Sequence, residues 1–125
     1  MRLLGPEIQI VQRSSMYESE PMYMAQQPKF LNMALEARTT VSPWATLEKL
    51  KKIEIVMGEH EHNKPRVIDL DLLFYGDEII ETPELTVPHP KIAERRFVLE
   101  PMVEIAPDFV HPTFGVSISA LLEVI

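Results

Sequence analysis

The sequence contains no cysteine, and this absence removes several kinds of chemistry at once. Without thiols the chain can form no disulfide, no thiolate zinc site and no cysteine nucleophile. Its apolar runs are only a few residues long, far short of the roughly 20 residues that a membrane-spanning helix needs. Both features are compatible with a reducing compartment, so we expect a cytoplasmic protein that has no membrane partner.

Positive charge is also scarce, because 12 Lys and Arg residues stand against 19 Asp and Glu residues, for a net charge of −7. This balance argues against nucleic acid as a partner, since nucleic-acid affinity comes largely from a basic footprint. A small acidic ligand such as a nucleotide stays compatible, because local charge can oppose net charge. With 125 residues, of which 46% are hydrophobic, the chain is predicted to form one globular domain over residues 1–125.

The order of elements indicates an α+β protein. The clearest helix begins after Ser42, which can cap it, and ends at Gly58, which can close it in left-handed geometry. Its apolar residues from Trp44 to Met57 recur at three- and four-residue spacing and predict one buried stripe. Residues 30–40 are ambiguous, because 33–38 favour a helix while 39–41 favour the end of a strand. The remaining expectations are strands at 7–18 and 67–75, a Gly76-Asp77 turn before 78–81, and helices at 92–100 and 117–124.

The most informative segment is residues 65–76, PRVIDLDLLFYG. Side chains alternate along a strand, so Asp69 and Asp71 are predicted to share one face while Leu70 and Leu72 share the other. Neighbouring carboxylates repel each other, and a divalent cation such as magnesium would remove that repulsion. The alternative is an acidic strand face that is simply solvated, since an Asp-x-Asp pair is short and common.

A cluster of cations offers a second candidate site. His89 lies between two prolines and is followed by Lys91, Arg95 and Arg96. These residues could form a cationic wall for phosphates, and Arg66, at the loop end of the acidic segment, could separately reach a phosphate. The alternative is that His89 is a turn residue and that the arginines are ordinary surface charges.

Six motifs occur in the order found in one known family. They are YESEP at 17–21, QPKFLN at 27–32, KIE at 52–54, PRVIDLD at 65–71, VPHP at 87–90 and RRFVLEP at 95–101. Through them the chain resembles the 6-hydroxymethyl-7,8-dihydropterin pyrophosphokinases of folate biosynthesis. The resemblance implies a ferredoxin-like sandwich of a mainly antiparallel sheet with helices. It also implies an ATP-dependent diphosphokinase, a transferase that moves pyrophosphate from ATP to the pterin hydroxymethyl group and leaves AMP.

The same resemblance implies the roles of individual residues. Asp69 and Asp71 would hold two Mg²⁺ ions that bridge the ATP phosphates, and with Arg66 and Arg95 they would form the catalytic set. The residues implied around ATP are Glu54, Arg66, Leu72, Thr86, His89 and Arg95. The residues implied around the pterin are Pro21, Met22, Phe30, Asn32 and Phe97.

Two departures from the family leave alternatives open. Family members begin with a strand and a glycine–serine–asparagine turn, and this chain starts after both, so we expect the first strand to be missing from the sheet. The segments at 30–32 and 69–71 would then pair directly, pair with another chain or leave unpaired edges. In addition, the loop at 59–64 carries acids where the family carries arginines. The alternatives to an enzyme are therefore a non-catalytic relative that binds a nucleotide or a partner protein, and a fragment of a longer folate-pathway protein. Other folate-pathway domains and self-association are the expected macromolecular partners.

Overall fold

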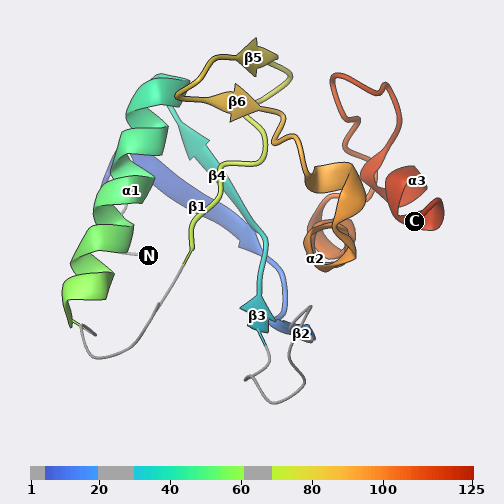
Figure 1. The fold of residues 1–125 in the computed structure, drawn as a ribbon, viewed down its shortest axis with the longest axis horizontal. Helices are drawn as coiled ribbons and strands as arrows, with labels where there is room; N and C mark the ends of the chain where they lie inside the picture. Colours follow the sequence, from blue (N-terminus) through green and yellow to red (C-terminus); the bar gives the residue numbers. More distant parts are fainter. Residues whose placement is uncertain (1–4, 20–29, 61–68) are drawn as a thin grey trace.

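The computed structural model describes residues 5–19, 30–60 and 69–125 (Figure 1). Its first part is a bent antiparallel ribbon of two strand pairs. β1 (Ile8–Arg13) pairs with β4 (Leu35–Thr39), and β2 (Tyr17–Ser19) pairs with β3 (Phe30–Asn32). At the bend, the Ser14 N–H donates to the Ala34 carbonyl at 2.9 Å, and the Ala34 N–H donates to Ser14 Oγ at 2.9 Å. Residues 30–40 thus contain the two strands β3 and β4 and no helix, because the cross-strand ladder outweighs the weak helical propensity of 33–38.

The long helix α1 (Pro43–His60) follows the ribbon. Ser42 caps it as predicted, since the Ala45 N–H donates to Ser42 Oγ at 3.1 Å. Two expectations are wrong. The helix does not end at Gly58 but continues to His60, and Trp44 is 47% exposed. Ile53, near the middle of the predicted stripe, is buried and packs against Ile8 of β1. Trp44 lies nine residues earlier, in the first turn of the helix, and takes no part in that contact.

Residues 69–75 form no strand, which corrects the prediction of a strand at 67–75 for the part that the structure describes. Exposure nevertheless alternates as expected, since Asp69 and Asp71 are exposed while Leu70 and Leu72 are half-buried. A strand needs a hydrogen-bonding neighbour, and the described pairing of β4 is to β1 alone. The turn at Gly76 is confirmed, but β5 (Ile80–Glu81) then pairs with β6 (Thr86–Val87) in a separate short hairpin.

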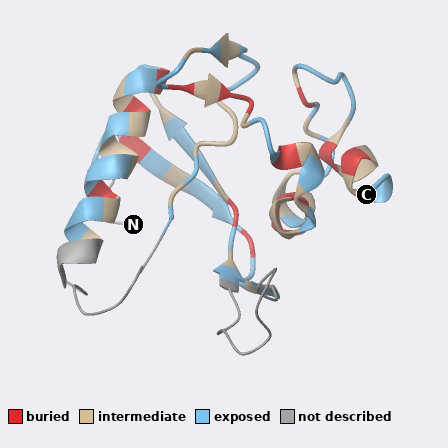
Figure 2. Cartoon of the chain, viewed as in Figure 1, coloured by how far each residue is buried: buried red, intermediate tan, exposed pale blue. Residues whose placement is uncertain are grey.

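The C-terminal part is helical. It comprises the 3₁₀ turn η2 (Ile92–Glu94), α2 (Arg96–Ile105) and α3 (Ile118–Glu123). The predicted helix at 92–100 is therefore confirmed in two pieces, and the one at 117–124 is confirmed with Ser117 as its cap. The main hydrophobic core joins these helices to the ribbon bend and consists of Ala34, Ile92, Leu99, Met102, Ile118 and Leu121 (Figure 2).

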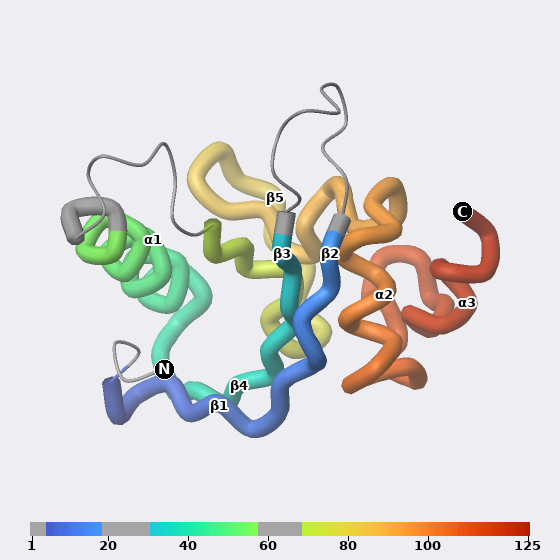
Figure 3. The backbone as a smooth tube through the Cα atoms, turned by 90° about the horizontal axis from the view of Figure 1, so that it is seen from below, coloured from blue at the N-terminus to red at the C-terminus, as the bar shows by residue number. Residues whose placement is uncertain are grey.

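The extended segment 69–75 connects two hydrophobic clusters. Leu70 packs on the smaller cluster between α1 and β1, whereas Leu73 and Phe74 pack on the main core. Figure 3 shows the ribbon between the helices, with α1 on one side and α2 and α3 on the other, and with β2 lying between β3 and α2. The fold is α+β, and no helix in the described part of the chain is long and apolar enough to cross a membrane.

Candidate active site

Two hydrogen bonds hold His89 in place, one through its backbone and one through its ring. Its backbone N–H donates to the carbonyl of Leu73 at 2.8 Å, which ties the residues after β6 to the extended segment. Its ring atom Nδ1 accepts a hydrogen bond from the Lys91 N–H at 3.2 Å. The proton of the neutral ring must then be on Nε2, so Nε2 is the atom that can donate to a ligand.

Three charged side chains act on His89. Burial lowers the pKa of His89 below its usual value of 6.5, the Asp71 carboxylate opposes this by raising it, and Arg95 and Lys91 lower it further. The charges of Asp71 and Arg95 thus both act on His89, although these two residues are 24 positions apart in the sequence. The Arg95 guanidinium also stands over the ring of Phe97, 5.6 Å from its centroid. Because its ring is neutral near pH 7, His89 would serve as a hydrogen-bond donor and not as a fixed cation.

Glu54 of α1 positions the acidic segment. Its Oε2 accepts a hydrogen bond from the backbone N–H of Leu70 at 2.6 Å, between the two aspartates in sequence. The sequence resemblance implied a place near the nucleotide for Glu54. The geometry adds a definite contact, because this carboxylate holds the backbone that carries Asp69 and Asp71.

The other predicted residues are placed on several elements. Thr86 lies on β6, where its hydroxyl donates to the Thr82 carbonyl at 3.3 Å. Asn32 lies on β3 directly opposite Tyr17 of β2, and Phe30 is paired through its backbone with Ser19. Leu72 is half-buried within the extended segment, and Phe97 is half-buried in the first turn of α2. Pro21, Met22 and Arg66 lie outside the described residues.

The acidic pair suits a hard divalent cation by its chemistry. Asp69 and Asp71 are both exposed and offer only oxygen donors. Among the described residues, no group of three or more His, Cys, Asp or Glu side chains could enclose a metal ion. Magnesium typically takes one or two carboxylates and completes its shell with water and substrate phosphates. The residues present fit that mode of binding.

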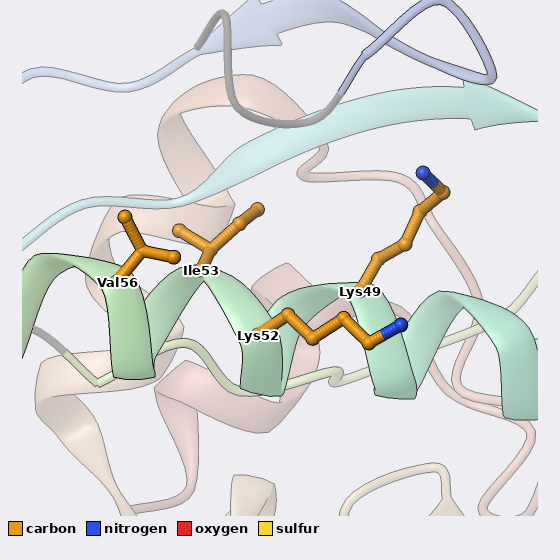
Figure 4. Close-up of a pocket in the computed structure, with 4 residues that line it drawn as sticks. All are labelled: Lys49, Lys52, Ile53 and Val56. Carbon is orange, nitrogen blue, oxygen red and sulfur yellow. The ribbon is translucent and has the colours of Figure 1, made fainter.

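A hollow elsewhere on the surface contains none of the predicted site residues. It has a volume of about 140 Å³ and is lined by Lys49, Lys52, Ile53 and Val56 of α1 (Figure 4). Lys49 forms an ion pair with Glu7 at 2.6 Å, so part of its charge is already neutralised. Four residues of one helix with one paired cation do not form a catalytic arrangement.

Sequence reasoning missed one polar cluster that the structure places beside β2. Glu104 of α2 accepts hydrogen bonds from the backbone and hydroxyl of Ser15 and from the hydroxyl of Tyr17. Tyr17 belongs to the YESEP motif, but nothing in the sequence connects it with a residue 87 positions away. No local signal could have found this contact.

An α+β domain that gathers an exposed acid pair, a neutral histidine and an arginine has the groups of a phosphate-handling protein. Comparison with known proteins defines the class more closely. Residues 1–107 match the family described as 7,8-dihydro-6-hydroxymethylpterin-pyrophosphokinase. The chain belongs to this pyrophosphokinase family.

Named relatives are similar over most of this chain. The folic acid synthesis protein fol1 of Pneumocystis carinii is 42% identical over 118 residues, which are 93% of this chain and 16% of that protein. The 2-amino-4-hydroxy-6-hydroxymethyldihydropteridine pyrophosphokinase of Aquifex aeolicus is 41% identical over 109 residues, which are 86% of this chain and 68% of that protein. The folate synthesis bifunctional protein of Arabidopsis thaliana is 44% identical over 101 residues, 78% of this chain and 21% of that protein. The chain thus spans about a sixth to two thirds of the length of these relatives.

Proposed function

We propose that this protein transfers pyrophosphate from ATP to the hydroxymethyl group of 6-hydroxymethyl-7,8-dihydropterin. In this reaction the pterin hydroxyl oxygen bonds to the β-phosphorus of ATP, the bond from that phosphorus to the α,β-bridging oxygen breaks, and AMP leaves. The hydroxyl proton passes to solvent. The product is an intermediate of folate biosynthesis, and membership of the pyrophosphokinase family supports the assignment.

The observation that carries the proposal is the 2.8 Å hydrogen bond from the His89 N–H to the Leu73 carbonyl, which holds the segment of His89 beside the segment of Asp69 and Asp71. Phosphoryl-type transfer requires little covalent chemistry from the protein, so positioning and charge stabilisation supply most of the rate. Arg95 would neutralise charge on the phosphate oxygens, while Nε2 of His89 would donate a hydrogen bond to one of them. Glu54 would hold the acidic segment in place by accepting a hydrogen bond from the N–H of Leu70.

Two Mg²⁺ ions belong to the proposal as cofactors, with Asp69 and Asp71 as their ligands. When bound, the ions would neutralise developing charge on the phosphates and activate the hydroxymethyl oxygen. Asn32 would hydrogen-bond to the edge of the pterin, with Phe30 and Phe97 near its ring, because a flat heterocycle requires an apolar slot with a few fixed polar groups. Arg66 is proposed at the triphosphate, and Pro21 and Met22 beside the pterin.

We also propose the finer architecture of the fold. We infer that the sheet belongs to a ferredoxin-like sandwich, because the bent ribbon, α1 and the helical pair occur in the order that the family resemblance implies. A cytoplasmic location and linkage to other folate-pathway domains complete the proposal. The linkage is supported by the Arabidopsis relative, which is named a bifunctional folate synthesis protein.

The decisive experiment measures AMP release from Mg²⁺-ATP by chromatography, with and without 6-hydroxymethyl-7,8-dihydropterin. The proposal expects AMP to form only when the pterin is present, with one pterin diphosphate formed for each AMP. Binding of ATP without pterin-dependent AMP release would support the non-catalytic alternative, in which the chain binds a nucleotide but does not transfer pyrophosphate.

A further inference from the structure

The carboxylate of Glu104 connects α2 to residues 15–17, where the chain passes from β1 to β2. The backbone N–H of Ser15 donates to its two oxygens at 2.9 Å and 3.1 Å, and the Ser15 hydroxyl donates at 3.2 Å. The hydroxyl of Tyr17 donates to Glu104 Oε1 at 2.7 Å. One side chain of α2 therefore accepts hydrogen bonds from two residues of the neighbouring chain segment.

The hydrogen bond between Tyr17 and Glu104 shifts the pKa values of these two groups in opposite directions. The hydrogen bond from Tyr17, followed by that from the Ser15 backbone, lowers the pKa of Glu104 below 4.5. The same hydrogen bond is the first cause that raises the pKa of Tyr17 above 10.0. At neutral pH the carboxylate is thus charged and the phenol keeps its proton, so the donor and the acceptor are both in the form that the contact requires.

Tyr17 passes this restraint on to the strand that carries Asn32. Tyr17 and Asn32 are directly opposite each other in the antiparallel pairing of β2 and β3. Directly opposed residues project from the same face of a ribbon, with Cβ atoms about 4.5–5.5 Å apart. The phenol side chain, held at its tip by Glu104, is consequently the immediate neighbour of the Asn32 side chain.

A second contact restrains the same region from the end of α2. The side-chain amide of Gln12 donates to the carbonyl of Ile105 at 2.6 Å. α2 lies alongside both β2 and β3, and β2 stands between β3 and the helix (Figure 3). Since each of these short strands has only three residues, the ladder alone supplies few hydrogen bonds, and the side-chain contacts with α2 fix where the ribbon lies.

We propose that Glu104 is a positioning residue for pterin recognition, which acts through Tyr17 to hold Asn32 in the geometry that reads the heterocycle. This inference rests on the proposed function, because it takes Asn32 as the group that contacts the pterin. It adds a specificity role for a carboxylate on α2 that would itself touch neither substrate.

The test compares Glu104→Ala, Tyr17→Phe and the double variant with the unmodified protein. Each is titrated with 6-hydroxymethyl-7,8-dihydropterin in the presence of a non-hydrolysable Mg²⁺-ATP analogue, and separately with that analogue alone. We expect each single variant to bind the pterin at least about fivefold more weakly, below the roughly hundredfold that a 1 Å misplacement at a reacting group can cost. Affinity for the nucleotide analogue should stay within about twofold of that of the unmodified protein. The double variant should bind the pterin about as weakly as Glu104→Ala alone, because Tyr17→Phe breaks a contact that Glu104→Ala has already removed.

Glu123→Ala is the matched control, because it removes the same charge from an exposed carboxylate at the end of α3. Equal losses for pterin and nucleotide would overturn the proposal and indicate a merely structural role. Unchanged pterin affinity in Tyr17→Phe would also overturn it.

A measurement without ligand separates this proposal from the proposed function. The side-chain amide resonances of Asn32 in ¹⁵N spectra should shift or broaden in Tyr17→Phe and Glu104→Ala but not in Glu123→Ala. If the unmodified protein binds no pterin while these resonances respond, the positioning contact holds and the proposed function fails. If the unmodified protein binds pterin and the resonances do not respond, the positioning role fails.

Discussion

The carboxylate of Glu54 accepts a 2.6 Å hydrogen bond from the backbone N–H of Leu70, and this contact holds the segment of the two aspartates against α1. Leu70 also packs on the cluster formed by Ile8 and Ile53. At Leu70, this unpaired backbone segment is thus held by a side-chain acceptor as well as by apolar packing. This arrangement makes the placement of Asp69 and Asp71 dependent on a residue of the helix.

Replacing Glu54 should therefore impair nucleotide binding through the backbone. In Glu54→Ala the Leu70 N–H loses its partner, which we expect to cost about 1 kcal/mol of stability at this half-buried position and to weaken Mg²⁺-ATP binding. Glu54→Gln should be milder, because its amide oxygen can still accept. Calorimetric titration with Mg²⁺-ATP checks this, with Glu48→Ala on the exposed face of α1 as the control. Equal ATP affinity in Glu54→Ala and Glu48→Ala would contradict the positioning role.

The acidic pair should determine the magnesium dependence of ATP binding. We expect Asp69→Asn and Asp71→Asn each to weaken Mg²⁺-ATP binding more than metal-free ATP binding, because a neutral amide is a poorer ligand for a hard cation. Asp77→Asn, in the exposed turn after Gly76, is the control. If both site variants keep the Mg²⁺-dependent affinity of the unmodified protein, the metal assignment is wrong.

Asp71→Asn offers an independent measurement on the ligand-free protein. The Asp71 carboxylate raises the pKa of His89, so removing this charge should lower that pKa further. The imidazole resonances of His89, followed by NMR from pH 8 to pH 5, report the shift directly. An unchanged titration would show that the two side chains are too far apart in solution to share a ligand.

Folding stability should decrease on mild acidification, with His111 as one cause. This buried ring accepts hydrogen bonds from the Thr113 and Phe114 N–H groups at 3.2 Å on Nδ1, and burial lowers its pKa below 6.5. Between the unfolded and folded pKa values the unfolded chain binds more protons, so this contribution is complete above about pH 6.5 and is lost as pH falls through the folded pKa.

Urea unfolding between pH 7.5 and pH 5 measures this dependence. His111→Asn is the informative variant, because its side-chain oxygen can accept the same N–H groups but does not titrate. We expect its free energy of unfolding to fall less over this range than that of the unmodified protein. Identical slopes would mean that His111 takes no part in the acid sensitivity.

Pterin recognition should depend on Asn32 more than ATP binding does. Asn32→Ala is expected to weaken pterin binding by roughly 1–3 kcal/mol, the usual cost when a polar group of a ligand is left without its buried partner. ATP affinity should change little, because the residues proposed for the triphosphate lie on other segments. Separate titrations with the two ligands decide the matter, and equal losses would assign Asn32 to the fold instead of recognition.

The free edge of β4 should promote self-association. In the described part of the chain β4 pairs with β1 only, and an unpaired edge invites another strand. We expect light scattering to show dimers or larger species at high protein concentration. Ala37→Lys should reduce their amount, because a lysine on an edge strand disfavours edge-to-edge pairing, whereas Thr40→Lys adds the same charge outside the strand. A monomeric unmodified protein would rule out association through this edge.

Local chemistry in the sequence determined much of this protein. Ser42 and Ser117 cap their helices, and the turn at Gly76 forms, because capping and turn geometry depend on residues only a few positions apart. Apolar alternation likewise fixed which of residues 69–72 face water, even though no strand forms there. The order of the six motifs is enough to identify the family.

Tertiary structure decided whatever depends on distant partners. The ladder between β1 and β4 made residues 35–39 a strand, and the lack of a described strand neighbour left 69–75 extended but unpaired. Ile53 is buried while Trp44 is exposed, because tertiary contacts determine which part of a helical apolar stripe is covered. The contact of Glu104 with Tyr17 joins residues 87 positions apart, a separation over which helical and strand periodicities carry no information. The physical reason is the same in each case: local propensities amount to a few tenths of a kcal/mol per residue, and packing against long-range neighbours outweighs them.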